Sequence, residues 1–169
     1  MDLKAYIRDI PDFPRQGILF RDITPLLADA AALDYAVREL AGPFENRGIE
    51  LVAAVEARGF IFAPAVARQL KAGFVPIRKA GKLPAETTSI SYDLEYGSDR
   101  MEVHTDAVMG KRVLLLDDLL ATGGTMEAAC SLLESLRVDI CGLTFLVELT
   151  ALGGRERLKK YTVHSVIKY

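Results

Sequence analysis

The sequence predicts an α/β protein whose doubly wound, mainly parallel sheet carries helices on both faces. Short apolar runs such as LVAAV (51–55) and VLLL (113–116) alternate with helical patterns along the central part of the chain. These runs are apolar throughout rather than at every second position, which indicates strands that are buried on both faces. Strands of this kind, when helices separate them, are typical of a parallel sheet.

The individual elements follow from these patterns. In chain order we expect a strand at 51–55, a helix at 60–70, strands at 73–77 and 113–116, a helix at 125–136, a strand at 142–149 and a helix at 152–160. The helix at 125–136 has apolar residues at helical spacing, so we expect this stripe to face the core. His164, in the terminal segment TVHSVIKY, is predicted to lie in a strand.

Two segments depart from this alternation. Residues 11–27 are interrupted by prolines and a glycine, and we expect them to be mostly loop within an N-terminal hood of about residues 1–35. The segment AGKLPAETTSISYDLEYGSDR (80–100) has the polar alternation of an exposed hairpin. We expect it to form a flexible flap over about residues 80–103, inserted between sheet strands. The whole chain, 1–169, is expected to be one domain.

Composition limits the classes of function. The chain has 169 residues, a formal net charge of −2 and no basic tail or stripe, so we expect no nucleic acid as a partner. No window approaches the roughly 18 apolar residues of a membrane span, and the N-terminus lacks the apolar core of a signal peptide. We therefore expect a cytoplasmic protein that binds no membrane. Cys130 and Cys141 lack metal-ligand or disulfide spacing and are predicted to be buried, reduced thiols.

Ligands of open α/β sheets bind outside the carboxyl ends of the strands. In this sequence that rule selects three junctions, which are EARGF after 51–55, RKAGK after 73–77 and DDLLATGGT after 113–116. Each junction carries charge or glycine where its strand ends. We therefore look for the site where these three segments meet.

The glycine-rich junction is predicted to bind a phosphate monoester. Its turn opens a helix, so free backbone N–H groups and the positive end of the helix dipole face outward. The predicted phosphate-binding residues are Ala121, Thr122, Gly123, Gly124 and Thr125. Asp117 and Asp118 precede this turn and would repel a phosphate unless they held hydroxyl groups or a metal. They suit the 2′- and 3′-hydroxyls of a ribose with Mg²⁺ nearby, and an acidic helix start without a ligand is the alternative.

Residues 113–125, VLLLDDLLATGGT, resemble the 5-phosphoribosyl-1-pyrophosphate binding motif of the type I phosphoribosyltransferases. The segments FPRQGILFRDITPLL, EARGFIF, VPIRKAGKLP and YDLEYGSDRMEVH are similar to the adenine phosphoribosyltransferases within this family. This resemblance covers nearly the whole chain. It implies transfer of the 5-phosphoribosyl group from 5-phospho-α-D-ribose 1-diphosphate to adenine, giving AMP and diphosphate in purine salvage. It also implies a homodimer and a Mg²⁺ ion held mainly by the substrate, near Asp117 and Asp118.

The resemblance also implies roles for the other junctions. The cations for the diphosphate would be Arg58, Arg78, Lys79, Lys82 and His104. Adenine would stack on Phe20, with backbone groups of Leu19 and Arg21 at its edge and Arg58 beside it. The alternatives are solvated surface charge for the lysines, and for Phe20 an aromatic side chain that only covers the edge of the domain.

Ala121 indicates which base is accepted. The 6-oxopurine relatives place an aspartate at this position and use it near N7 of the base, whereas alanine has no acid to offer. The resemblance implies that Glu95 in the flap motif LEYG acts instead, as general acid/base or by stabilising charge on the base, while Tyr96 closes over the reacting centre. A free glutamate has a pKa of about 4.3 and is ionised at neutral pH. The alternative is that Glu95 is one more charge on a solvated hairpin.

Three other functions are weighed against this one. A 6-oxopurine or xanthine phosphoribosyltransferase is disfavoured by Ala121 and the loop around Phe20. A non-catalytic regulator that binds the ribose donor as an effector would need an appended DNA-binding domain or a basic face, for which this chain leaves little room. An inactive paralogue is disfavoured because the acids, the phosphate turn, the basic group and the flap glutamate occur together.

Overall fold

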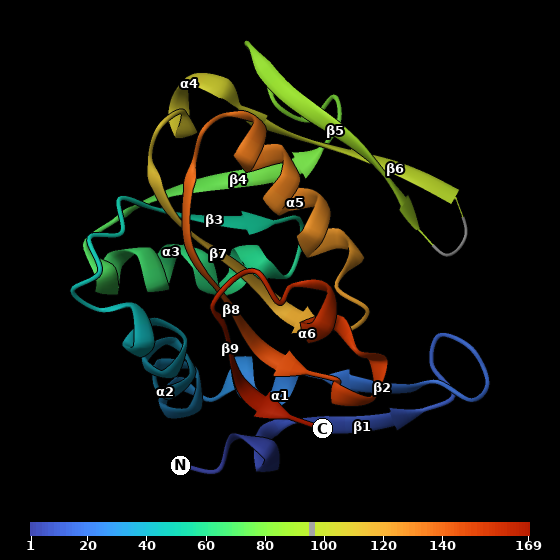
Figure 1. Ribbon diagram of the computed structural model, residues 1–169. Helices are drawn as coiled ribbons and strands as arrows, with labels where there is room; N and C mark the ends of the chain where they lie inside the picture. The colour runs from blue at the N-terminus through green and yellow to red at the C-terminus, as the bar shows by residue number, and fades with distance from the viewer. Residues whose placement is uncertain (95–96) are drawn as a thin grey trace.

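The computed structural model describes residues 1–94 and 97–169, and its centre is a seven-stranded sheet (Figure 1). The strand order across this sheet is β5-β6-β4-β3-β7-β8-β9. Its parallel strands are β3 (Leu51–Val55), β4 (Gly73–Lys79), β7 (Arg112–Leu120), β8 (Asp139–Glu148) and β9 (Val163–Lys168). The antiparallel pair β5 (Thr87–Leu94) and β6 (Gly97–His104) extends one edge, because β6 also pairs with β4.

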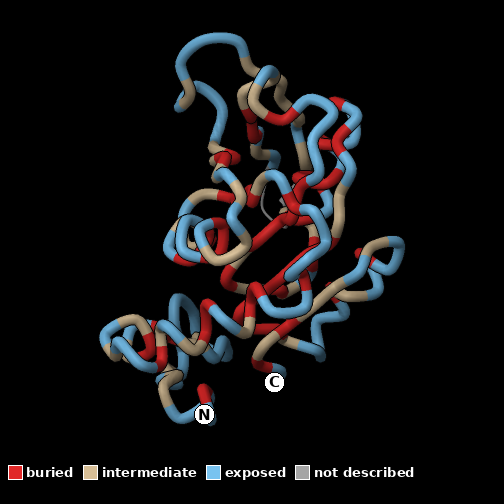
Figure 2. Tube along the Cα trace, turned by 90° about the vertical axis from the view of Figure 1, so that its left-hand side faces the viewer, coloured by how far each residue is buried: buried red, intermediate tan, exposed pale blue. Residues whose placement is uncertain are grey.

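Helices pack on both faces of the sheet, which separates the core into two parts. One part contains α1 (Thr24–Ala28), α2 (Ala30–Ala41) and α3 (Gly59–Leu70), and the other contains α5 (Gly124–Ser135) and the short α4 (Thr105–Val108). In β3, Val52 faces the first part and Ala53 the second, as the alternation of a strand requires. Figure 2 shows the buried residues following the central strands. The predicted doubly wound arrangement is confirmed.

The direction of winding reverses next to β3. The chain runs from β3 to β4 on one side and later returns to β7 on the other side of β3. Ligands of open α/β sheets bind at such a switch point, outside the carboxyl ends of the two strands. Strand β7 is longer than the predicted 113–116, since Asp117 pairs with Phe145 and Leu120 with Glu148. Asp117 and Asp118 therefore lie within the strand rather than after it.

The N-terminal segment is more ordered than the sequence indicated. The expectation that residues 11–27 are mostly loop is wrong, because β1 (Arg8–Pro11) and β2 (Leu19–Asp22) form an antiparallel hairpin and α1 follows. The hairpin is tied at its base by an ion pair of 2.6 Å between Arg8 and Asp22. Pro25 lies in the first turn of α1, where a missing N–H leaves no hydrogen bond unmade.

The C-terminal segment also differs from expectation. The helix predicted over 152–160 is reduced to the 3₁₀ turn η3 (Thr150–Leu152) and the four-residue α6 (Gly154–Arg157), since Gly153 adopts φ +68° between them. Two further 3₁₀ turns are η1 (Leu3–Tyr6) and η2 (Gly42–Phe44). Cys130 is buried as expected, whereas Cys141 is only half-buried; both thiols are free. His164 lies in β9, as predicted.

The flap and the hood lie at opposite ends of the site edge. In Figure 1 the β5–β6 hairpin extends at the upper right and the β1–β2 hairpin lies at the bottom, with the arrowhead of β7 between them. The hairpin predicted within 80–103 is therefore present, with its strands at Thr87–Leu94 and Gly97–His104. No helix within residues 1–94 and 97–169 has the length and apolarity needed to cross a membrane.

Replacing Gly142 by alanine is expected to destabilise the fold. Gly142 lies in β8, and a Cβ at this position would be 3.0 Å from Cζ of the buried Phe44 and closer still to its Cε1. Such overpacking costs about 1–3 kcal/mol of unfolding free energy, which urea denaturation measures. Gly42→Ala is the control, because a Cβ there meets nothing within 4 Å. Equal stability of the two variants would contradict this account of the core.

Candidate active site

Two adjoining pockets lie at the switch point. The first, which we call the phosphate cup, has a volume of about 210 Å³ and is lined by Arg58 and residues 117–126. The second, the apolar pocket, has a volume of about 110 Å³ and is lined by Ile18, Leu19, Phe20, Arg21, Ile23, Arg58, Asp118, Leu119, Val147 and Leu149. Arg58 and Asp118 line both, so an anionic group in the cup and a flat apolar group in the pocket would lie next to each other.

The backbone of the phosphate cup is shaped by glycines. Between β7 and α5, Gly123 adopts φ +82°, which L side chains rarely adopt. A Cβ on Gly123 would also lie 2.8 Å from the carbonyl oxygen of Gly154, and a Cβ on Gly154 would lie 2.9 Å from Leu120 Cδ1 and closer still to the carbonyl oxygen of Ala121. Backbone thus packs directly against backbone behind the cup. The first residues of α5 line the cup, and the N–H groups of a first helical turn have no partner within the helix, which is what anion binding uses.

The two aspartates are held in a poorly solvated place. Asp118 is 5% exposed, and its Oδ2 lies 2.7 Å from Nε of Arg58. Burial raises the pKa of Asp118 and is opposed by the charge of Arg58. Burial raises the pKa of Asp117 well above its usual range, and the neighbouring charge of Asp118 raises it further. A ligand that donated hydrogen bonds, or a cation, would relieve both effects.

These acids fit a magnesium ion only in partnership with a substrate. Among residues 1–94 and 97–169 no group of three or more His, Cys, Asp or Glu side chains is arranged to hold a metal. Mg²⁺ commonly takes one or two carboxylates and completes its shell with water and substrate phosphate oxygens. Asp117 and Asp118 can supply that share.

Arg58 lies where the two pockets meet. It follows β3 at the start of α3, and its guanidinium carbon is 5.6 Å from the ring centroid of Phe20. Helix α3 begins unusually close to β7, since a Cβ on Gly59 would be 3.1 Å from Oδ1 of Asp117. The sequence did not single out Gly59, although its place in EARGF directly after Arg58 was the available signal.

The apolar pocket is walled by the hood on one side and by the end of β8 on the other. Phe20 lies in β2 and meets Phe13 edge-on, with ring centroids 5.2 Å apart. Arg21 is held by an ion pair with Asp9, and its guanidinium carbon lies 3.8 Å from the ring of Tyr169. These contacts fix the backbone of β2, whose groups at Leu19 and Arg21 are predicted to contact the edge of the purine.

The opposite wall of the apolar pocket is formed by Val147 and Leu149. The sequence analysis missed both residues, and it also missed the contact of Tyr169 with Arg21. An apolar pair at the end of a buried strand is indistinguishable from core in the sequence, so no signal identified them.

The remaining predicted cations lie at the carboxyl end of β4. Arg78 donates two hydrogen bonds of 3.1 Å to Glu56, which lower the pKa of that carboxyl, and Lys79 forms an ion pair of 2.9 Å with Asp99 of β6. Lys82 lies in the turn that follows and is exposed. Arg78 and Lys79 are therefore held in place by acids that the sequence analysis did not assign, although Glu56 was visible in EARGF.

Other predicted residues are not gathered with this group. His104 ends β6, and its Nε2 lies 2.7 Å from the carbonyl oxygen of Pro84. Because β6 runs antiparallel to β4 and Glu102 pairs with Arg78, His104 lies beyond that pair and away from Lys79. Glu95 and Tyr96 lie outside the described residues.

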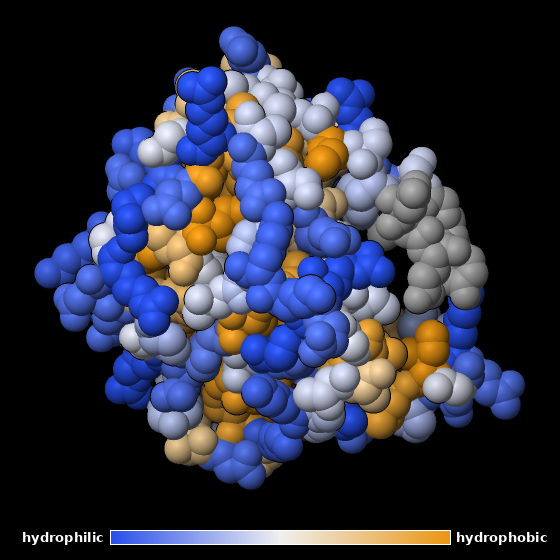
Figure 3. Space-filling model, viewed as in Figure 1, coloured by the Kyte–Doolittle hydropathy of each residue, from blue (hydrophilic) through white to orange (hydrophobic). Residues whose placement is uncertain are grey.

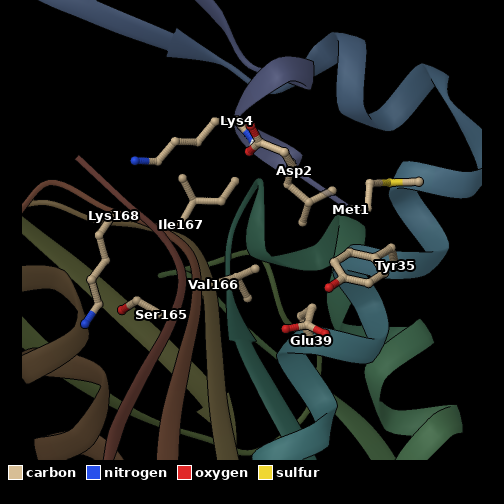
Figure 4. A pocket seen from close by; sticks show the side chains of 10 residues that line it. Met1, Asp2, Lys4, Tyr35, Glu39, Ser165, Val166, Ile167 and Lys168 are labelled. Carbon is tan, nitrogen blue, oxygen red and sulfur yellow. Dashed lines mark hydrogen bonds between the residues drawn. The ribbon is translucent and has the colours of Figure 1, made fainter.

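A larger hollow lies elsewhere on the molecule. It has a volume of about 440 Å³ and is formed by the N-terminus, α2 and β9, as Figure 4 shows. Tyr35 and Glu39 come from α2 and Lys168 from β9, while Lys4 projects from η1. None of the residues predicted for the site lines it, and it lies at the β9 edge of the sheet rather than at the switch point.

Comparison with known proteins places the chain in a family. A family model described as a phosphoribosyl transferase domain matches residues 25–168. The adenine phosphoribosyltransferase of Rhodopirellula baltica is 58% identical over 170 residues, which cover 100% of this chain and 82% of that protein.

Solved structures agree with this assignment. The adenine phosphoribosyltransferase of Thermoanaerobacter pseudethanolicus has a TM-score of 0.94 and 53% identity, covering 99% of this chain and 98% of that one. The APRTase of Giardia lamblia in complex with 9-deazaadenine has a TM-score of 0.93 and 40% identity, covering 99% and 96%. The resemblance read from the sequence is confirmed, and the chain belongs to the phosphoribosyl transferase family, within the adenine phosphoribosyltransferases.

Proposed function

We propose that the phosphate cup binds the ribose donor and that the apolar pocket binds adenine. The activity is that of the adenine phosphoribosyltransferases: the 5-phosphoribosyl group of 5-phospho-α-D-ribose 1-diphosphate is transferred to adenine, giving AMP and diphosphate. One observation carries the proposal, which is that an anion-binding turn and an apolar pocket with an aromatic wall share Arg58 and Asp118. The base would then lie next to C1 of the ribose, the carbon whose bond to diphosphate is replaced by a bond to adenine.

The donor is gripped at three places. The backbone N–H groups and hydroxyls of residues 121–125 bind the 5′-phosphate, where the helix dipole adds to the attraction. Asp117 and Asp118 accept hydrogen bonds from the ribose 2′- and 3′-hydroxyls. The poor solvation of this acid pair supports the assignment, since two hydroxyl donors would replace the hydrogen bonds from water that burial has removed.

The third grip is on the diphosphate. We assign it to Arg58, Arg78, Lys79 and Lys82, whose positive charges stabilise the leaving group as the bond to the ribose breaks. Glu56 and Asp99 hold Arg78 and Lys79 in place before the donor arrives. For His104 the role in diphosphate binding stays a prediction, without support from its position.

Mg²⁺ is the proposed cofactor, held mainly by the donor and near Asp117 and Asp118. When bound, it supplies positive charge to the diphosphate oxygens. The protein's own contribution to the step is positioning and exclusion of water, because the developing charge on the ribose resembles that of an oxocarbenium ion and is sensitive to attack by water.

Adenine is bound by stacking on Phe20 and by backbone groups of Leu19 and Arg21. The 9-deazaadenine in the Giardia lamblia structure supports a purine site in this fold. Position 121 carries no acid, so we assign the proton chemistry at the base to Glu95 and closure of the flap to Tyr96. A 6-oxopurine acceptor is disfavoured for the same reason.

We further propose a single-domain chain, 1–169, that forms a homodimer in the cytoplasm. Apolar side chains gather at the tip of the hood hairpin, at the lower right of Figure 3, and Phe13 is 50% exposed. On α3, Ile61 is 45% exposed. These exposed groups support burial against a second copy, and two free thiols suit a reducing compartment. The hood of about 1–35 and the flap of about 80–103 are the proposed subdivisions of this domain.

The acceptor is tested with the purified protein, the ribose donor and Mg²⁺. We expect nucleotide formation with adenine to exceed that with hypoxanthine, guanine, xanthine and orotate, because the pocket is apolar and residue 121 carries no acid. Product is measured by chromatography of the nucleotide. A clear preference for another base would overturn the assignment, and donor binding without turnover of any base would favour the regulator instead.

Glu95→Gln is expected to lower kcat far more than it weakens donor binding. The amide keeps the size of the side chain but cannot exchange the proton at the purine nitrogen, an exchange worth typically 10²–10⁴-fold in rate. Steady-state kinetics and equilibrium binding of the donor are measured side by side. Glu86→Gln, on an exposed residue of the same segment, is the control. An unchanged kcat would remove Glu95 from the reaction.

Asp117→Asn is expected to stabilise the empty protein while weakening donor binding. A carboxyl whose pKa is raised by folding binds its proton more tightly in the native state than in the unfolded chain, so ionisation at higher pH favours the unfolded chain. The stability of the natural protein relative to the variant should therefore fall as the pH rises above about 4 and approach that of the variant in acid. Asparagine keeps the oxygen that accepts the N–H of Asp118.

Urea denaturation at several pH values and binding of the donor test this pair of effects. Asp106→Asn changes an exposed aspartate and is the control. Equal unfolding free energies at every pH would contradict the burial argument, and intact donor affinity would contradict the contact with the ribose hydroxyls.

A further inference from the structure

A buried carboxylate outside the contacts assigned above lies among the strands of the flap. Glu102 of β6 is 6% exposed and pairs in register with Arg78 of β4 on one side and Ser89 of β5 on the other. Burial of a carboxylate is unfavourable unless hydrogen bonds satisfy its oxygens. The hydrogen-bond donors to Glu102 therefore show which part of the structure this side chain fixes in place.

Those donors lie in the turn between β4 and β5 and at the first residue of β5. Oε1 of Glu102 accepts the backbone N–H of Lys82 at 3.0 Å and that of Leu83 at 2.9 Å, and Oε2 accepts the hydroxyl of Thr87 at 3.3 Å. The hydrogen bond from Leu83, with others from Gly81 and Lys82, lowers the pKa of Glu102 against the opposing effect of burial. The side chain is thus an ionised acceptor whose charge is satisfied by backbone dipoles.

A second residue of β6 grips the same turn. His104 contacts the carbonyl oxygen of Pro84, two residues beyond Lys82. The turn is therefore tied to β6 at three consecutive residues, 82–84, rather than supported by its own hydrogen bonds alone. Its backbone carries Lys82, while the side chains of Arg78 and Lys79 project from the end of the preceding strand.

We propose that Glu102 is the positioning residue of the diphosphate site: it clamps the Lys82–Leu83 backbone to β6 and so aims the Lys82 ammonium at the leaving diphosphate. It acts as a hydrogen-bond acceptor and not through its net charge, which alone would repel the diphosphate. The proposal rests on the diphosphate role assigned above to Lys82. Because β6 begins directly after Tyr96 in the sequence, the same clamp ties the diphosphate turn to the strand that leaves the flap motif.

Two conservative variants separate the role of Glu102 as a hydrogen-bond acceptor from the effect of its charge. Glu102→Gln keeps an oxygen at the same reach, so both backbone N–H bonds survive and the KM for the donor should stay within about threefold. Glu102→Asp keeps the charge but withdraws it by one methylene, so the KM for the donor should rise about tenfold or more, as with Glu102→Ala. The KM for adenine should change little in all three variants. Glu86→Asp is the matched control on an exposed residue.

A double-mutant comparison separates positioning from general support of the fold. If Glu102 acts through Lys82, then Glu102→Asp should add little to the rise in donor KM already caused by Lys82→Ala. Additive effects, equal rises in the KM for donor and adenine, or a Gln variant weaker than the Asp variant would overturn the proposal. Should Lys82→Ala leave the donor KM unchanged, the diphosphate role of Lys82 itself would fail, an outcome distinct from failure of the clamp.

Discussion

Arg58, at the start of α3 after β3, and Asp118, within the neighbouring strand β7, form an ion pair of 2.7 Å that joins the two halves of the site. It forms because the winding reverses between β3 and β7, which brings the segment after β3 and the carboxyl end of β7 to one edge of the sheet. The phosphate cup lies on one side of this pair and the apolar pocket on the other. Without it, a buried carboxylate would be left unpaired between a second acid and an apolar wall, which is strongly unfavourable.

Three of the cationic side chains around the site are paired with carboxylates that a ligand could displace. Arg58 is held by Asp118, Arg78 by Glu56 and Lys79 by Asp99. Such pairs keep the long cationic side chains ordered in the empty protein. A donor rich in phosphate and hydroxyl groups can share or replace these partners, so the order needed for binding is largely present before the ligand arrives.

The sequence predicted the part of the fold that depends on local patterns. Apolar runs located β3, β4 and β7, and the switch between helical and strand spacing located α3 and α5. The hood was misjudged because its pairing depends on side-chain contacts such as that of Arg8 with Asp22, which no local strand pattern in residues 11–27 reveals. Likewise the acids and the glycine turn of the site were visible as a motif, whereas Glu56 and Tyr169 acquire their roles only from the neighbours that folding provides.

The backbone packing behind the phosphate cup has an entropic consequence. Gly154 fills the space behind Ala121 and Gly123, so the turn is supported by atoms that have no rotamers to freeze. A phosphate entering the cup therefore orders few protein groups, and little conformational entropy is lost at this end of the donor. In the proposed diphosphate turn, by contrast, the exposed side chain of Lys82 has many rotamers, so a ligand bound there would cost more conformational entropy.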